Sequence, residues 1–185
     1  MNGEARLNLS AIIEKLAESQ TTFLRAADSI RPEQWNKKPS AEAWSAAEVV
    51  AHLVMVERAI VGGADRITQK VPQPIPFLKR AHFPLWLVEI RMIRRKTPIP
   101  LDPTLIGGKE EMLGDLRGAR ERTLAFLEET KGRDLSAYHW RHAFLGQLNV
   151  YKWFEMIAAH QLRHSKQMRE IGKQLPKVVG ISQNR

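Results

Sequence analysis

The feature that most restricts the fold is the spacing of apolar residues, which recur every three or four positions over four long stretches. Such spacing places apolar side chains on one side of an α-helix. The stretches cover residues 9–30, 46–67, 109–130 and 149–172. No run alternates apolar and polar residues as a half-buried strand does, and no fixed-period repeat is visible. The sequence therefore predicts an all-α four-helix bundle.

Short signals at two of the predicted helix starts support this assignment. Ser45 and Glu48 have the spacing of a capping box, in which each side chain accepts a hydrogen bond from the backbone amide of the other residue. Trp44, just before this cap, can pack on Val49 one turn later. Asn149 precedes the fourth stretch and is a favourable N-cap residue. Local chemistry thus predicts where the second and fourth helices begin.

The predicted helix ends are marked by proline and glycine. Pro32 stops the first helix because its ring excludes further helical turns. Gly132 follows the third helix and suits the left-handed conformation that closes many helices. Gly62 and Gly63 lie inside the second stretch and mark either a close contact with another helix or an early end. The end of the second helix, placed near residue 67, therefore stays open.

Residues 70–104 differ from the rest of the chain because they are rich in proline. Seven of the ten prolines lie between positions 72 and 103, which excludes a continuous helix there. A short helix is expected over residues 82–96. We interpret the segment as an insert between the second and third helices of a single domain spanning residues 1–185, a length typical of one domain.

Composition removes several functional classes. The chain has no cysteine, which excludes disulfides, iron–sulfur clusters, thiolate zinc fingers and a cysteine nucleophile. No apolar run approaches the roughly 18 residues of a membrane span. The opening M-N-G-E lacks the basic and apolar parts of a secretory signal, so a cytoplasmic location is expected. The net charge of +9 permits nucleic acid, anionic lipid or an anionic small molecule as partner.

Three histidines occupy positions where the helical pattern calls for apolar residues. His160 and His164 are four residues apart, so their rings project from one side of the fourth helix. His52 lies on the buried stripe of the second helix, and bundle cores build metal sites from inward residues of facing helices. Three imidazoles suit Zn²⁺, Ni²⁺ or Fe²⁺ and leave a coordination position for water or substrate. The alternative is that each histidine is a core residue bonded to a neighbour.

Other polar residues near these stripes have weaker claims to a function. Glu57 lies about 140° around the helix from His52, which favours a solvated or salt-bridged surface position. Gln167 could orient His164 or instead satisfy a backbone group. His142 could lean over the ion or act as a general acid, although a loop histidine is more often exposed. None of these residues is assigned to the site from the sequence.

Two segments of the chain resemble the DinB-like superfamily of damage-inducible bacterial proteins. They are P-S-A-E-A-W-S-A-A-E-V-V-A-H-L at residues 39–53 and L-G-Q-L-N-V-Y-K-W-F-E-M-I-A-A-H-Q-L-R-H-S-K-Q-M at residues 145–168. The resemblance implies a four-helix bundle, often dimeric, in which one histidine of the second helix and an H-x-x-x-H pair of the fourth bind a divalent metal. These positions match His52, His160 and His164.

The resemblance leads to two functional hypotheses. The superfamily includes metal-dependent transferases acting with low-molecular-weight thiols such as bacillithiol and mycothiol, which implies a homodimeric enzyme that transfers such a thiol to a small electrophilic substrate. The predicted insert holds seven basic and two acidic residues, and its Arg91, Arg94 and Arg95 could then bind a carboxylate of the thiol. The alternative is a non-catalytic binding protein, with a structural metal or none, whose basic insert contacts nucleic acid or a protein partner.

Overall fold

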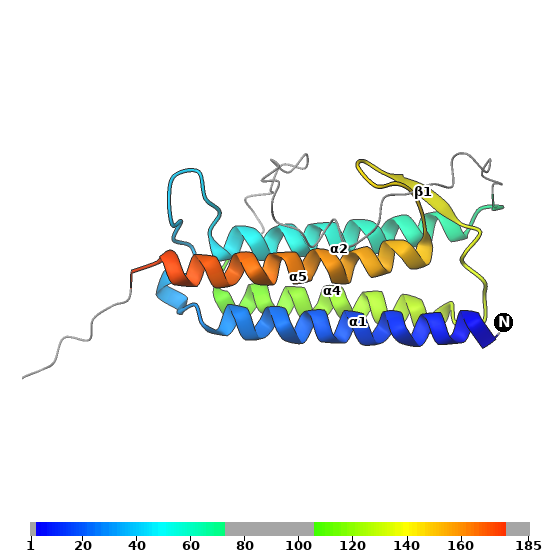
Figure 1. The fold of residues 1–185 in the computed structure, drawn as a ribbon, viewed down its shortest axis with the longest axis horizontal. Coiled ribbons are helices and arrows are strands. Elements are labelled where there is room, and N and C mark those ends of the chain that lie inside the picture. Colours follow the sequence, from blue (N-terminus) through cyan, green and yellow to red (C-terminus); the bar gives the residue numbers. More distant parts are fainter. Residues whose placement is uncertain (1–2, 73–105, 177–185) are drawn as a thin grey trace, which may run out of the picture.

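Four helices run side by side along one long axis (Figure 1). The computed structural model describes residues 3–72 and 106–176, and within them the helices are α1 (Gly3–Asp28), α2 (Ala46–Thr68), α4 (Lys109–Glu129) and α5 (Val150–Gln174). α1 packs along α5, α2 packs along α4, and α2 also contacts α5. The four predicted helical stretches are therefore confirmed.

Most of the predicted insert lies outside the described residues. This applies to the short helix expected over residues 82–96 and to Arg91, Arg94 and Arg95. The organisation of this segment and its expected carboxylate contacts therefore stay predictions.

The starts of α2 and α5 agree with their local signals, and α4 ends where predicted but is closed in a different way. Ser45 and Glu48 form the capping box of α2, and the Asn149 side chain accepts a hydrogen bond from the Lys152 amide at the start of α5. α4 ends with Thr130 at φ −99° and ψ 4°, and Gly132 does not adopt the predicted left-handed conformation. The hydroxyl of Thr130 donates instead to the carbonyl oxygen of Phe126 at 2.6 Å, which satisfies one of the last free carbonyls of the helix.

The sequence missed a β-hairpin between α4 and α5. Strand β1 (His139–His142) pairs antiparallel with β2 (Gly146–Asn149). Gly146 closes the three-residue loop with φ 87°, a conformation that few other residues adopt and that three-residue hairpin loops require. Strands of four residues are too short to show a clear alternation of apolar and polar positions, so this segment was wrongly predicted as loop.

The core consists of two apolar clusters at different heights along the bundle, with polar residues between them. One cluster includes Leu16 of α1 and Phe154 of α5, and the other includes Phe23 of α1 and Met168 of α5; each of these side chains is fully buried. Burial of a side chain of this size contributes about 1.5–3 kcal/mol to stability. On every helix the residues that lie between the two clusters include buried polar ones: Ser19, Glu57, Arg120, Thr123 and Gln161.

These polar residues form one network that joins all four helices. Arg120 of α4 pairs through two nitrogens with the carboxylate of Glu57 on α2, at 2.7 and 3.1 Å. The same guanidinium donates to the side chain of Gln161 on α5 and to the backbone carbonyl of Leu16 on α1. Glu57 was predicted to be a surface residue, but it is only 3% exposed. The prediction was wrong because Arg120 provides a buried partner for its charge.

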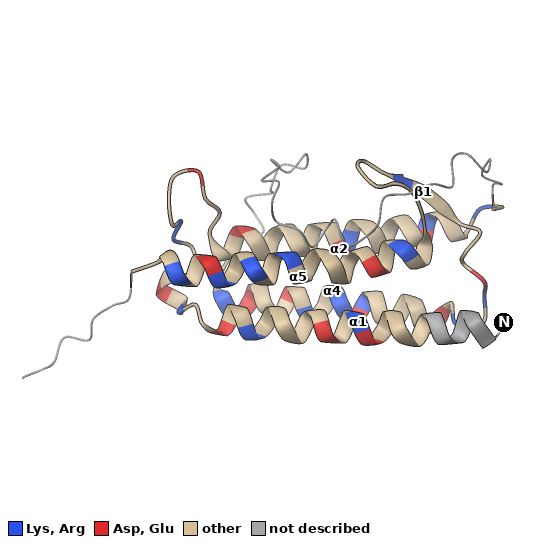
Figure 2. Ribbon diagram, in the orientation of Figure 1, with Lys and Arg blue, Asp and Glu red and all other residues tan. Residues whose placement is uncertain are grey.

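Charged side chains outside this network belong mainly to exposed positions on the helices. Basic and acidic residues are interspersed along the described helices (Figure 2).

None of the helices in residues 3–72 and 106–176 is both long enough and apolar enough to cross a membrane.

Candidate metal centre

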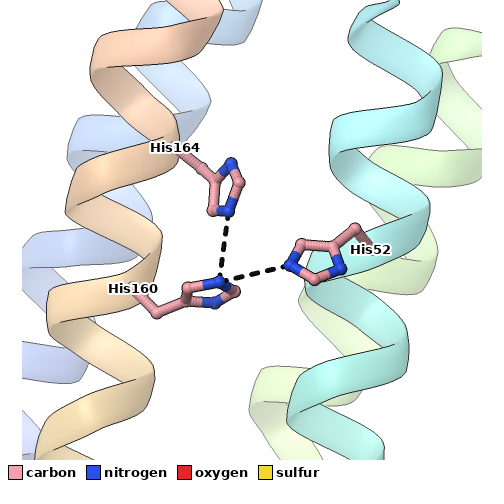
Figure 3. Close-up of side chains that lie close together, drawn as sticks. All are labelled: His52, His160 and His164. Atoms are coloured by element: carbon pink, nitrogen blue, oxygen red, sulfur yellow. Dashed lines mark hydrogen bonds between the residues drawn. The ribbon is translucent and has the colours of Figure 1, made fainter. Parts of the chain in front are cut away.

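The start of α2 fixes the position of the first histidine. The Ser45 hydroxyl accepts from the Glu48 amide at 3.2 Å, and the Glu48 carboxylate accepts from the Ser45 amide at 2.8 Å. With the helix beginning at Ala46, His52 lies on its second turn and projects toward α5 (Figure 3). The indole of Trp44 meets the His52 ring edge-on, with 5.3 Å between ring centroids. The capped helix start and this aromatic contact together hold His52.

The other two histidines lie one turn apart on α5, as their spacing predicts. Nε2 of His160 lies 3.1 Å from Nε2 of His164 and 3.2 Å from Nε2 of His52 (Figure 3). One nitrogen from each of the three rings lies within 4.8 Å of the other two. The structure thus brings together the three histidines that the sequence selected, from two helices that are far apart in the chain.

Hydrogen bonds between the three rings do not account for all the close nitrogen–nitrogen contacts. A ring nitrogen carries either one proton or one lone pair, so Nε2 of His160 cannot make two full hydrogen bonds to His52 and His164. Three imidazole nitrogens this close together could instead serve as the donor set of one divalent ion. The geometry is therefore compatible with a metal site.

The environment of His52 and His160 favours the neutral form of both rings, which metal binding requires. Burial lowers the pKa of His52 to about 4. Burial also holds the pKa of His160 well below its usual value, and the neighbouring His164, His52 and Arg163 lower it further. Near neutral pH the lone pairs of His52 and His160 are therefore available to a cation.

Gln167 orients the third ring. Its Oε1 lies 2.9 Å from Nδ1 of His164, one turn away on α5. Because Oε1 is an acceptor, this contact places the proton of His164 on Nδ1 and leaves the Nε2 lone pair facing the cluster. Of the two roles that the sequence left open for Gln167, the structure supports the orienting one.

Two glutamates of α2 do not reach the centre. Glu48 is occupied in the cap of α2, and Glu57 is occupied by Arg120. The sequence did contain a signal for the Glu57–Arg120 pair. Arg120 falls on the inward stripe of α4, between Leu116 and Thr123. A charged residue at a core position requires a buried partner, but the stripe does not say which helix supplies it.

His142 was considered as a loop histidine and lies instead in strand β1, where it is half-buried. Its ring packs against Trp153, with 5.1 Å between centroids, and its charge is one of those that lower the pKa of His160. Burial lowers the pKa of His142 itself. His139, from the same strand, contacts the backbone carbonyl of Ala137 and not the cluster.

The sequence of this chain matches a protein family and a curated protein. The profile of the DinB superfamily matches residues 15–168, which include all four helices in large part and all three histidines. The chain is also 30% identical over 145 residues to the uncharacterized protein YuaE of Bacillus subtilis. The aligned region covers 77% of this chain and 86% of YuaE. No solved structure matches significantly.

Proposed function

Since this chain belongs to the DinB superfamily, we propose that it binds a divalent metal through His52, His160 and His164, and that it is a metal-dependent transferase acting with a low-molecular-weight thiol. The observation that supports the proposal most is the convergence of three imidazole nitrogens from α2 and α5 on one point. An all-imidazole site suits Zn²⁺ or Ni²⁺, and also Fe²⁺.

The dimensions of the cluster fit such an ion. A tetrahedral ion with nitrogen ligands at about 2.0–2.1 Å holds those nitrogens about 3.3 Å apart. The two shorter nitrogen–nitrogen distances in the structure, 3.1 and 3.2 Å, are close to this value. The third pair, His52 and His164, is bounded only at 4.8 Å, so these two rings would have to turn toward each other to admit an ion, while Gln167 would keep the His164 lone pair directed at it.

The set of three protein ligands leaves room for a fourth ligand from a substrate or cofactor. When bound, the ion supplies Lewis acidity that lowers the pKa of a coordinated thiol. Arg163, partly buried on α5 between His160 and His164, adds a positive charge whose field reaches His160.

Metal analysis of protein purified without an affinity tag tests the first part of the proposal. We expect about one divalent ion per chain in the wild type and less than a tenth of that in His160→Ala, because two imidazoles hold an ion far more weakly than three. His139→Ala, a histidine variant outside the cluster, should keep full occupancy. Full occupancy in His160→Ala would refute the assignment.

The catalytic part is tested against the binding-protein alternative. The metal-loaded protein is screened for transfer of small thiols to electrophiles, and binding of duplex DNA is measured from low to moderate salt. Counterion release makes DNA affinity fall steeply with salt, whereas a thiol held by a metal should lose little affinity. Tight, salt-sensitive DNA binding that is unchanged in His164→Ala, together with no thiol binding, would support the alternative.

A further inference from the structure

The β-hairpin lies over the line of contact between α2 and α5. The Trp140 ring of β1 stacks on Trp153 of α5, with 4.6 Å between centroids and 8° between planes. The Trp153 indole N–H also donates to the Trp140 carbonyl at 3.3 Å. On α2, Gly63 leaves room for the same ring, since a Cβ there would lie 3.6 Å from Trp140. The close neighbour of Gly63 is thus the hairpin and not another helix as predicted, and α2 does not end early but continues to Thr68.

The histidine cluster belongs to the same line of contact. Trp153 and His160 are seven residues apart on α5, which is nearly two full turns and about 10 Å along the axis. Gly63 and His52 are eleven residues apart on α2, which is close to three full turns. The residues that hold the hairpin thus lie on the same helix faces as the residues that form the candidate metal centre.

Within the hairpin, His142 lies on the side that faces α5. It follows Trp140 by two positions in β1, so both side chains project from the same face of the strand. The His142 ring accordingly packs on Trp153. This contact holds His142 against the face of α5 that also carries His160, since Trp153 and His160 are seven residues apart on that helix.

The tight loop that follows β1 fixes which nitrogen of His142 carries the proton. Nδ1 accepts hydrogen bonds from the backbone amides of Phe144 and Leu145, each at 3.1 Å. A nitrogen that accepts these bonds has no proton, so in the neutral ring the proton is on Nε2. The loop and the Trp153 contact therefore hold the His142 ring in place with its proton on Nε2.

We propose that Nε2–H of His142 is a ligand-binding group of the metal centre, and that it donates a hydrogen bond to an oxygen acceptor on the ligand held by His52, His160 and His164. The proposal rests on the metal site proposed above and specifies its ligand. The ligand is a small molecule with a metal-binding atom and, at a short distance from it, a carboxylate, carbonyl or sulfonate oxygen.

The test compares two thiols in protein loaded with Co²⁺, whose visible spectrum reports ligand binding. 2-Mercaptoethanesulfonate carries weakly coordinating oxygen acceptors, and 1-propanethiol has a similar length without them. His142→Asn is the variant of choice because the asparagine oxygen can still accept from the loop amides while no donor reaches the Nε2 position. His139→Asn, on the opposite face of the same strand, is the matched control.

We expect His142→Asn to weaken binding of the sulfonate thiol about 10-fold and to leave 1-propanethiol binding and Co²⁺ content unchanged, since a hydrogen bond to a charged acceptor has about this value. The control should bind both thiols as the wild type does. Equal losses for both thiols, or none for either, would refute the role of His142 while the metal site stands. Failure of the wild type to take up Co²⁺ or to bind either thiol would refute this proposal together with the proposed function.

A second readout is independent of binding affinity. Long-range ¹H–¹⁵N spectra of the imidazoles should show the His142 proton on Nε2 in the wild type, and its resonance should shift when the sulfonate thiol is added. A proton on Nδ1 would contradict the geometry on which the proposal rests.

Discussion

Nδ1 of His164 lies 2.9 Å from Oε1 of Gln167, one helical turn further along α5. The contact connects the orientation of a candidate metal ligand to a residue that does not itself reach the metal. The effect of this contact on metal affinity should therefore be separable from the effect of removing one of the three histidines.

Gln167→Leu should lower the affinity for Zn²⁺ by about 10–100-fold, because His164 loses the acceptor that fixes its ring and its proton. Gln167→Glu keeps an acceptor at this position and should restore most of the affinity. Competition with a chromophoric chelator measures both values. Equal affinities for the wild type and Gln167→Leu would show that the contact has no orienting role.

The metal-free protein should lose stability as the pH falls below about 6.5. The pKa of His52 is about 4 in the folded state and near 6.5 when the chain is unfolded, so the unfolded state binds more protons over this interval. The free energy of unfolding should then fall by about 3 kcal/mol between pH 6.5 and 4 from this residue. Urea denaturation of wild type and His52→Leu, both treated with a chelator, measures the change. An identical pH dependence in the two proteins would contradict the prediction.

Breaking the buried Glu57–Arg120 pair should be strongly destabilising. Arg120→Leu leaves the Glu57 carboxylate uncompensated in the core, which costs about 3–5 kcal/mol. The exposed pair Arg58–Asp115, at 2.9 Å, links the same two helices and serves as the control. Arg58→Leu should cost less than about 1 kcal/mol. Similar losses in the two variants, measured by urea denaturation, would mean that burial does not set the strength of this pair.

Substitutions of Gly63 should separate helix stability from hairpin placement. Gly63→Ala adds a Cβ at ordinary contact distance from Trp140 and should stabilise α2 by about 0.5–1 kcal/mol, since glycine is unfavourable inside a helix. Gly114→Ala, at a site of α4 without neighbours within 4 Å, is the control and should stabilise similarly. Gly63→Leu should displace Trp140 and change the tryptophan fluorescence. Gly63→Leu with wild-type fluorescence and stability would show that the hairpin does not pack there.

The extents of α2, α4 and α5 were predictable because the signals that set them are local, whereas α1 begins at Gly3, six residues before its predicted start. The Ser45 capping box and the Asn149 cap act within one turn, and the apolar spacing of each helix reports its buried face. The same reasoning placed His160 and His164 on one side of a helix and His52 on the inward face of another. The end of α4 at Thr130 matches the predicted stretch, but the way it closes was not predictable, because a hydroxyl bond replaced the left-handed glycine.

Only the tertiary structure decided which side chains meet across helices. The sequence did not indicate that Glu57 would be buried, because that depends on Arg120 lying opposite it when α2 packs on α4. Nor did it indicate that His142 would pack on Trp153, because that requires a four-residue strand and a loop closed by Gly146. Periodicity fixes the face of a helix on which a residue lies, but the height and rotation at which two helices pack are set by the sum of all their contacts.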